Sequence, residues 1–388
     1  MLVTIIALLL STHFYPIDTT DFGCFPCRCL QKEDGAKHLA SCSLAGILRL
    51  KDVSLSEQRI TSIAEDAFTS SRGLQWLSLS ANKLPVLPEK VFASLDSLQL
   101  LDLSLKHVEP DTFSGLSNLR ILSLSQNGLK ELPEDLLRPM PALEQLLLGS
   151  IVYIYGNELS VLPQELLQHS PRLRVLDLSE NKLTSLPNHI FDKTPLLETL
   201  DLASNKLTDL PGKIFSGLSK LQELDLGWNR LSELPAEVFA GLSSLQSLDL
   251  GFNKLSELPA EVFSGLGKLQ ELDLSRNTLS ELPAEVFSGL GKLQELDLSR
   301  NKLSELPLFA GLSNLRKLHL RSNKLGELPS EVWSKSFAGL SHLRELYLDG
   351  NDLGKLPLEV WDHLFAGLDN LQVLFLRDNK LGELPAQV

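Results

Sequence analysis

The stretch LSELPAEVFSGLGKLQELDLSRN occupies Leu255–Asn277 and occurs again, letter for letter, at Leu279–Asn301. One residue separates the two copies. A catalytic site is a single asymmetric arrangement of side chains, and repeating its sequence does not build one. Repetition does suit a structure in which each unit stacks on its neighbour. A fixed period therefore predicts a solenoid, which can run long as one domain.

The repeated unit follows the pattern L-x-x-L-x-L-x-x-N-x-L, which begins fourteen times, and eight of the thirteen steps are 24 residues long. In one unit Leu224 and Leu226 alternate with polar residues, the two-residue period of a half-buried strand. We expect the leucines to face a shared core, where each fully buried one contributes roughly 1.5–3 kcal/mol. The units begin at Leu50, Leu74, Leu98, Leu119, Leu143, Leu173, Leu197, Leu221, Leu245, Leu269, Leu293, Leu315, Leu343 and Leu371.

Two other positions of the unit are also occupied regularly. An asparagine amide at the N position is expected to bond backbone groups where the chain leaves the strand. A phenylalanine ten residues later is expected to stack with its equivalents as a second spine of the core. The asparagines are Asn82, Asn127, Asn157, Asn181, Asn205, Asn229, Asn253, Asn277, Asn301, Asn323, Asn351 and Asn379, and the phenylalanines are Phe92, Phe191, Phe215, Phe239, Phe263 and Phe287.

Composition limits the partners and the location of the chain. Its 388 residues carry 36 Lys and Arg against 49 Asp and Glu, a net charge of −13 that disfavours nucleic acid as a ligand. The apolar run MLVTIIALLL predicts a signal peptide over residues 1–20 and hence secretion, although a trimmed or misassigned N-terminus is the alternative. No later stretch reaches the roughly 18 apolar residues of a membrane span.

All four cysteines, Cys24, Cys27, Cys29 and Cys42, lie near the N-terminus. Their spacing is compatible with a four-thiolate zinc site, but behind a signal-like segment disulfides are favoured. Four cysteines allow three pairings, and spacing does not choose between them.

The repeat resembles the 24-residue units of extracellular leucine-rich-repeat proteins, such as Toll-type receptors, Slit, the acid-labile subunit and lamprey variable lymphocyte receptors. The resemblance implies an α/β solenoid: a right-handed horseshoe with a parallel concave sheet and a disulfide-stapled cap. It implies a cap over 21–49, repeats over 50–388 with the last incomplete, and the pairs Cys24–Cys29 and Cys27–Cys42. The matching C-terminal cysteine cap is absent, which suggests a truncated sequence or a partner covering that end.

Chemistry-bearing motifs are missing from the sequence. It contains no G-x-S-x-G, H-E-x-x-H or G-x-G-x-x-G, and its eight histidines show no metal-ligand spacing. We therefore predict that the chain is not an enzyme and has no cofactor and no resident metal.

The outward-facing strand positions form the candidate binding surface. Six successive units carry an aspartate at the middle exposed position: Asp177, Asp201, Asp225, Asp249, Asp273 and Asp297. Like charges about 4.8 Å apart repel by roughly 1 kcal/mol in water. Either Leu-Asp-Leu is a common filling of the repeat, neutralised by nearby lysines and arginines, or the aspartates form a docking strip for a basic partner or calcium.

Aromatic residues mark further candidate contact surfaces. The middle position holds His319, Tyr347 and Phe375 in the last three units, beside Lys317, Arg321 and Arg377, and exposed aromatics next to arginine are typical of interface hot spots. Trp228 and Phe252 form a smaller pair on adjacent turns. The inserted residues Ser150–Tyr155, with Tyr153 and Tyr155, are either a binding protrusion or a neutral insertion.

These observations predict an extracellular recognition protein that binds a macromolecule, most simply a protein, on the concave face. Side chains at fixed strand positions present a preorganised surface, which lowers the ordering cost of association. The alternative is an extracellular-matrix scaffold protein without a single tight ligand.

Overall fold

The computed structural model describes residues 28–31, 37–41, 51–149, 156–309, 311–326, 330–356, 365 and 367–381. The chain forms two compact units, Met1–Arg172 and Leu173–Val388. The predicted signal peptide, Cys24, Cys27, Cys42, Tyr153 and Tyr155 lie outside the described residues, and Cys29 is described by its backbone alone. The cap and the cysteine pairing therefore remain predictions.

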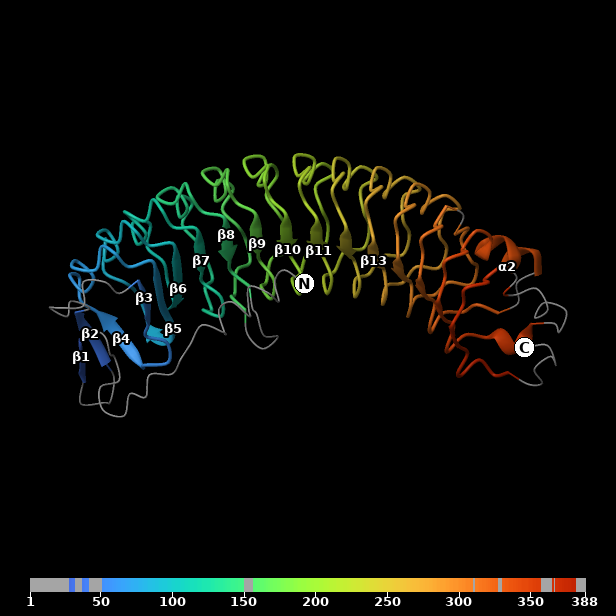
Figure 1. Cartoon of the computed structure of the whole chain (residues 1–388), viewed down its shortest axis with the longest axis horizontal. Helices are drawn as coiled ribbons and strands as arrows, with labels where there is room; N and C mark the ends of the chain where they lie inside the picture. Colours follow the sequence, from blue (N-terminus) through green and yellow to red (C-terminus); the bar gives the residue numbers. More distant parts are fainter. Residues whose placement is uncertain are drawn as a thin grey trace. The chain divides into compact units, whose positions relative to one another are not determined.

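The first unit contains two groups of strands (Figure 1). A small sheet has the order β1-β2-β4, with β1 and β2 antiparallel and β2 and β4 parallel. The repeats supply a series of parallel strands, each beside the next. The bounds are β1 Arg28–Gln31, β2 Lys37–Ser41, β3 Asp52–Ser54, β4 Ile60–Ile63, β5 Trp76–Leu84, β6 Leu100–Leu105, β7 Ile121–Ser123 and β8 Gln145–Leu147.

The second unit continues the pattern with nine short strands, each parallel to its neighbour and in register (Figure 1). Together with the five parallel repeat strands of the first unit they match the fourteen repeats counted in the sequence. The bounds are β9 Val175–Asp177, β10 Thr199–Asp201, β11 Glu223–Asp225, β12 Ser247–Asp249, β13 Glu271–Asp273, β14 Glu295–Asp297, β15 Lys317–His319, α2 Ser330–Phe337, β16 Glu345–Tyr347, η1 Leu353–Lys355 and β17 Val373–Phe375.

The leucine alternation places the core as predicted. Leu224 and Leu226 are buried, whereas Glu223 and Asp225, which alternate with them along the strand, are half-buried. Each turn contributes its leucines to a core that it shares with its neighbours, because a strand of three residues cannot bury them alone. We call the surface that carries the residues between the leucines the sheet face.

The asparagine ladder is confirmed. The Asn229 amide donates hydrogen bonds to the carbonyl oxygens of Leu202 (2.9 Å) and Leu226 (3.1 Å), and its Oδ1 accepts the N–H of Leu207 at 3.0 Å. These backbone groups belong to adjacent turns, so one buried side chain ties two turns together. The amide thereby satisfies backbone groups that the short strand leaves without a ladder partner.

The phenylalanine spine is also confirmed. Neighbouring rings such as Phe215 and Phe239 lie 6.4 Å apart between centroids, and the interplanar angle is 6°. Phe309 and Phe337 extend the stack toward the C-terminus at the same spacing. Trp333, on α2, is fully buried against Phe337, and the helix accommodates the extra residues of that repeat.

Candidate functional site

The six aspartates form a ladder on the sheet face. They are paired in register from β9 to β14, so each carboxylate lies next to those of the neighbouring turns. In each, Oδ1 accepts a hydrogen bond from the backbone N–H two residues later, for example Gly227 to Asp225 at 2.8 Å. The same bond recurs at Asp177, Asp201, Asp249, Asp273 and Asp297 with lengths of 2.6–2.9 Å. Each carboxylate therefore fixes the backbone where its strand ends.

Burial changes the chemistry of this ladder. The expected exposure of Asp177 is wrong: its relative accessibility is 3%, and its Oδ1 accepts bonds from both the N–H and the hydroxyl of Ser179. The other five aspartates are half-buried. Loss of solvent, followed by repulsion from Asp225 and Asp273, raises the pKa of Asp249 to about 7. The pKa of Asp201 is raised well above its usual value, first by desolvation and then by its charged neighbours.

A raised pKa means that part of the ladder holds protons near neutral pH, so its charge is smaller than six carboxylates suggest. Among the residues that the structure describes, no cluster of His, Cys, Asp and Glu is arranged to hold a metal ion. The geometry thus supports the view that the aspartates organise the strand ends and present a weakly anionic strip.

The aromatic residues of the last turns come together as predicted. The rings of His319 and Tyr347 are stacked with centroids 4.3 Å apart, and those of Tyr347 and Phe375 with centroids 5.0 Å apart. Phe375 is 37% exposed at the end of this stack. Three rings from three successive strands therefore form one continuous platform on the sheet face.

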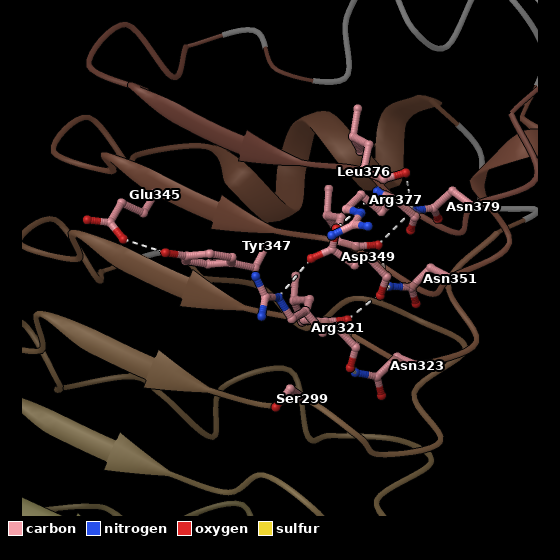
Figure 2. A network of polar contacts seen from close by, with 12 residues as sticks. Ser299, Arg321, Asn323, Glu345, Tyr347, Asp349, Asn351, Leu376, Arg377 and Asn379 are labelled. Carbon is pink, nitrogen blue, oxygen red and sulfur yellow. Dashed lines mark hydrogen bonds and ion pairs between the residues drawn. The ribbon is translucent and has the colours of Figure 1, made fainter.

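Charged groups hold this platform in place (Figure 2). The Arg321 guanidinium lies 4.4 Å from the centroid of the Tyr347 ring, and its Nε is 2.7 Å from Oδ2 of Asp349. The Tyr347 hydroxyl donates to Glu345 at 2.6 Å, a bond that raises the pKa of the phenol. The sequence predicted Arg321 as a flanking residue but not its partner Asp349, nor the bond between Tyr347 and Glu345.

On the other side of the platform, His319 faces β14. Its Nε2 lies 3.5 Å from Glu295, and Nζ of Lys317 lies 3.4 Å from the same carboxylate. The close approach of His319, more than the nearby Lys317 charge, lowers the pKa of Glu295. Arg377 contributes its backbone N–H to Asp349 at 3.0 Å, and its side chain is exposed.

A second aromatic stack lies at the strand ends of three turns. The rings of Trp228 and Phe252 are stacked with centroids 3.6 Å apart, and the Arg276 guanidinium covers the Phe252 ring at 4.3 Å. Trp228 is 58% exposed, the most exposed aromatic side chain of the described residues. The sequence predicted the aromatic pair but not the Arg276 guanidinium that stacks on Phe252, although Arg276 occupies the same position of the following repeat.

The first unit contains a shallow polar groove that the sequence did not predict. It has a volume of about 400 Å³ and is lined by residues that include Gln75, Gln99 and Asn118. Arg120 and Glu144, which also line it, are joined by two hydrogen bonds of 3.0 and 2.7 Å. The lining further includes Asp96 and Arg172 but no aromatic side chain, unlike the stacks of the second unit.

Comparison with known proteins agrees with this architecture. The family described as "Leucine rich repeat" matches residues 49–104, 104–150, 150–207, 195–255 and 244–303, and a two-copy form of the repeat matches 291–332. Comparison with curated proteins found no significant match.

Several solved structures are similar. A leucine-rich-repeat protein of Leptospira interrogans is 31% identical, with 92% of this chain and 90% of that chain covered and a TM-score of 0.70. The Drosophila Toll–Spatzle complex gives 25% identity, coverage of 82% and 49%, and a TM-score of 0.66. The TLR13 complex with the RNA ssRNA13 gives 26% identity, coverage of 88% of this chain and 66% of that chain, and a TM-score of 0.62.

No helix in the described part of the chain is both long and apolar enough to cross a membrane.

Proposed function

Because this chain belongs to the leucine-rich-repeat family, a parallel-sheet solenoid, we propose that it recognises a protein partner on the sheet face of its second unit, outside the cell or at its surface. The role is binding without catalysis. The observation that carries the proposal is the platform formed by His319, Tyr347 and Phe375 with Arg321.

This platform combines the features of an interface hot spot. Aromatic rings and arginine dominate the binding energy of many protein interfaces, in part because they bury a large area for few rotatable bonds. Here the rings are already stacked, and Arg321 is held by Asp349 before any partner arrives. Binding therefore orders few side chains, and the entropy cost of association is small.

The similar structures support an extracellular recognition role. Toll was solved with the protein Spatzle and TLR13 with an RNA. For this chain a protein is the favoured ligand, because its net charge of −13 opposes the approach of a phosphate backbone. The signal-like N-terminal segment of the sequence favours the same location.

The test is a binding measurement with a matched pair of variants. The purified chain captures candidate partners from extracellular fractions, and the affinity of each is then measured by surface plasmon resonance. Tyr347→Ala/Phe375→Ala is expected to lower the affinity at least about tenfold, the effect of removing one hot-spot cluster. Val86→Ala/Val161→Ala removes two side chains, 44% and 61% exposed, that lie outside the platform, and it is expected to bind normally.

Circular dichroism first establishes that both variants are folded. A partner whose affinity is the same for wild type and Tyr347→Ala/Phe375→Ala would exclude the platform as its binding site. Broad, unsaturable binding to many proteins would instead support the matrix scaffold interpretation.

A further inference from the structure

One row of side chains in the second unit follows the strand ends. It consists of the residue just before each ladder asparagine, and from Glu180 to Ser322 that residue has a positive φ between 52° and 55°. Because φ is the same throughout the row, side chains leave the backbone in similar directions and can stack from turn to turn. The row reads Glu180, Ser204, Trp228, Phe252, Arg276, Arg300 and Ser322.

The stack within this row ends at Trp228. Phe252 is covered on one face by Trp228 and on the other by the Arg276 guanidinium. Trp228 is covered by Phe252 alone, and among the described residues no other ring or cation stacks on the indole. The next row position is Ser204, whose side chain is too short to cover a ring. One face of the indole is therefore open, consistent with its 58% exposure.

Ser204 thus marks an unfilled place between Trp228 and Glu180. Adjacent parallel strands lie about 4.8 Å apart, so two turns span ~10 Å. A planar group stacked about 3.5–4 Å from the indole fits within that interval. The surroundings carry charges of both signs: Glu180 occupies the next row position, and Lys206 follows Ser204 by two residues.

The protein twice places its own arginine over an aromatic ring of a neighbouring turn. Arg276 lies over Phe252 at 4.3 Å, and Arg321 lies over Tyr347 while pairing with Asp349 at 2.7 Å. A guanidinium is flat, always charged and rich in donors, so it satisfies a ring face and a carboxylate together. A lysine ammonium is compact and strongly hydrated and does so less well.

We propose that the place above Ser204 binds an arginine side chain from a basic segment of the protein partner, which completes the stack on Trp228 beside Glu180. This proposal rests on the proposed function, and it names the chemistry that the partner brings to the sheet face. The partner's arginine extends a series that already runs through Trp228, Phe252 and Arg276.

The experiment uses two capped nonapeptides of equal charge, one alternating Gly and Arg and the other alternating Gly and Lys. Their affinities for the full chain are measured by isothermal titration calorimetry at physiological salt. We expect the arginine peptide to bind at least about fivefold more tightly than the lysine peptide, because only the guanidinium stacks. Equal affinities would overturn the proposal and leave only a general attraction to acidic groups.

Two variants locate the binding. Trp228→Ala removes the indole ring and is expected to weaken binding of the arginine peptide about tenfold. Ser204→Arg places the protein's own guanidinium on the indole, and is expected to abolish the preference for arginine. The backbone allows this change, since φ is 54° at Ser204 and 53° at Arg276. Thr208→Arg, an exposed position on the same turn, adds the same charge outside the row and is expected to retain the preference.

Arginine preference that survives both Trp228→Ala and Ser204→Arg would refute this location. The outcome is separable from the fate of the proposed function. A partner that depends on Tyr347 and Phe375 but binds Ser204→Arg normally would support recognition by the sheet face and overturn the arginine site.

Discussion

Replacing Asp249 by asparagine should stabilise the protein at neutral and basic pH and have no effect in acid. Asp249 lies in the middle of the aspartate ladder, where desolvation and the charges of Asp225 and Asp273 raise its pKa to about 7. An asparagine side chain has the same shape and keeps an oxygen for the N–H of Gly251, which now donates to Asp249 at 2.7 Å. The substitution therefore removes the charge and leaves the hydrogen bond.

The magnitude follows from the two pKa values of Asp249. The pKa of the Asp249 carboxyl is 3.8 in the unfolded chain and about 7 in the folded chain, so the folded protein binds this proton more tightly. The stability that this proton contributes is fully present below about pH 4, is lost as pH rises to about 7, and does not change further above that pH. The difference between the two pKa values corresponds to roughly 4 kcal/mol. Screening by solvent and proton release by neighbouring aspartates reduce the expected gain in the free energy of unfolding of Asp249→Asn to about 2 kcal/mol.

The assay is urea-induced unfolding followed by circular dichroism at about pH 4, pH 6 and pH 8, the range over which the linkage acts. The free energy of unfolding of Asp249→Asn should equal that of the wild type at the lowest pH and exceed it increasingly above. Glu261→Gln, on the exposed part of the same repeat, serves as the control and should show no such trend.

A difference between Asp249→Asn and wild type that is the same at every pH would refute the reasoning, because it would show that shape or hydrogen bonding outweighs charge. So would destabilisation at about pH 8, which would mean that the charged carboxylate stabilises the strand end.

Three further changes test the repeat itself, each measured as the free energy of unfolding in urea. Asn253→Ala should destabilise the protein by about 2–4 kcal/mol, because it leaves several buried backbone groups without partners. The control Asn118→Ala removes one exposed hydrogen bond and should cost less than about 1 kcal/mol. Phe239→Ala should cost about 3–5 kcal/mol by opening a cavity between two stacked rings, and a smaller loss would mean that the neighbouring turns collapse into it. Gly241→Ala should lower the free energy of unfolding by about 1–3 kcal/mol, since φ is 94° there and a Cβ would lie 2.7 Å from the Ser216 carbonyl oxygen. The control Gly267→Ala should be tolerated, because a Cβ at Gly267 would meet open space.

Much of the architecture could be predicted because the interactions that build it repeat with the sequence. The buried leucines, the asparagine at each strand end and the stacked phenylalanines each recur at one position of the unit. Every turn contacts its immediate neighbours in the same way, so correct assignment of one repeat assigns the others. Asp177 departs from this expectation, since it is buried rather than exposed.

The strands, the leucine core and the rows of side chains between the leucines could be predicted from the two-residue and 24-residue periods of the chain. Which side chains of adjacent turns touch could be seen only in three dimensions. Arg276 covers Phe252, Arg321 pairs with Asp349, and one face of Trp228 stays open. Such contacts depend on side-chain direction and on the lateral spacing of turns, and the raised pKa of Asp249 depends on the burial that stacking produces.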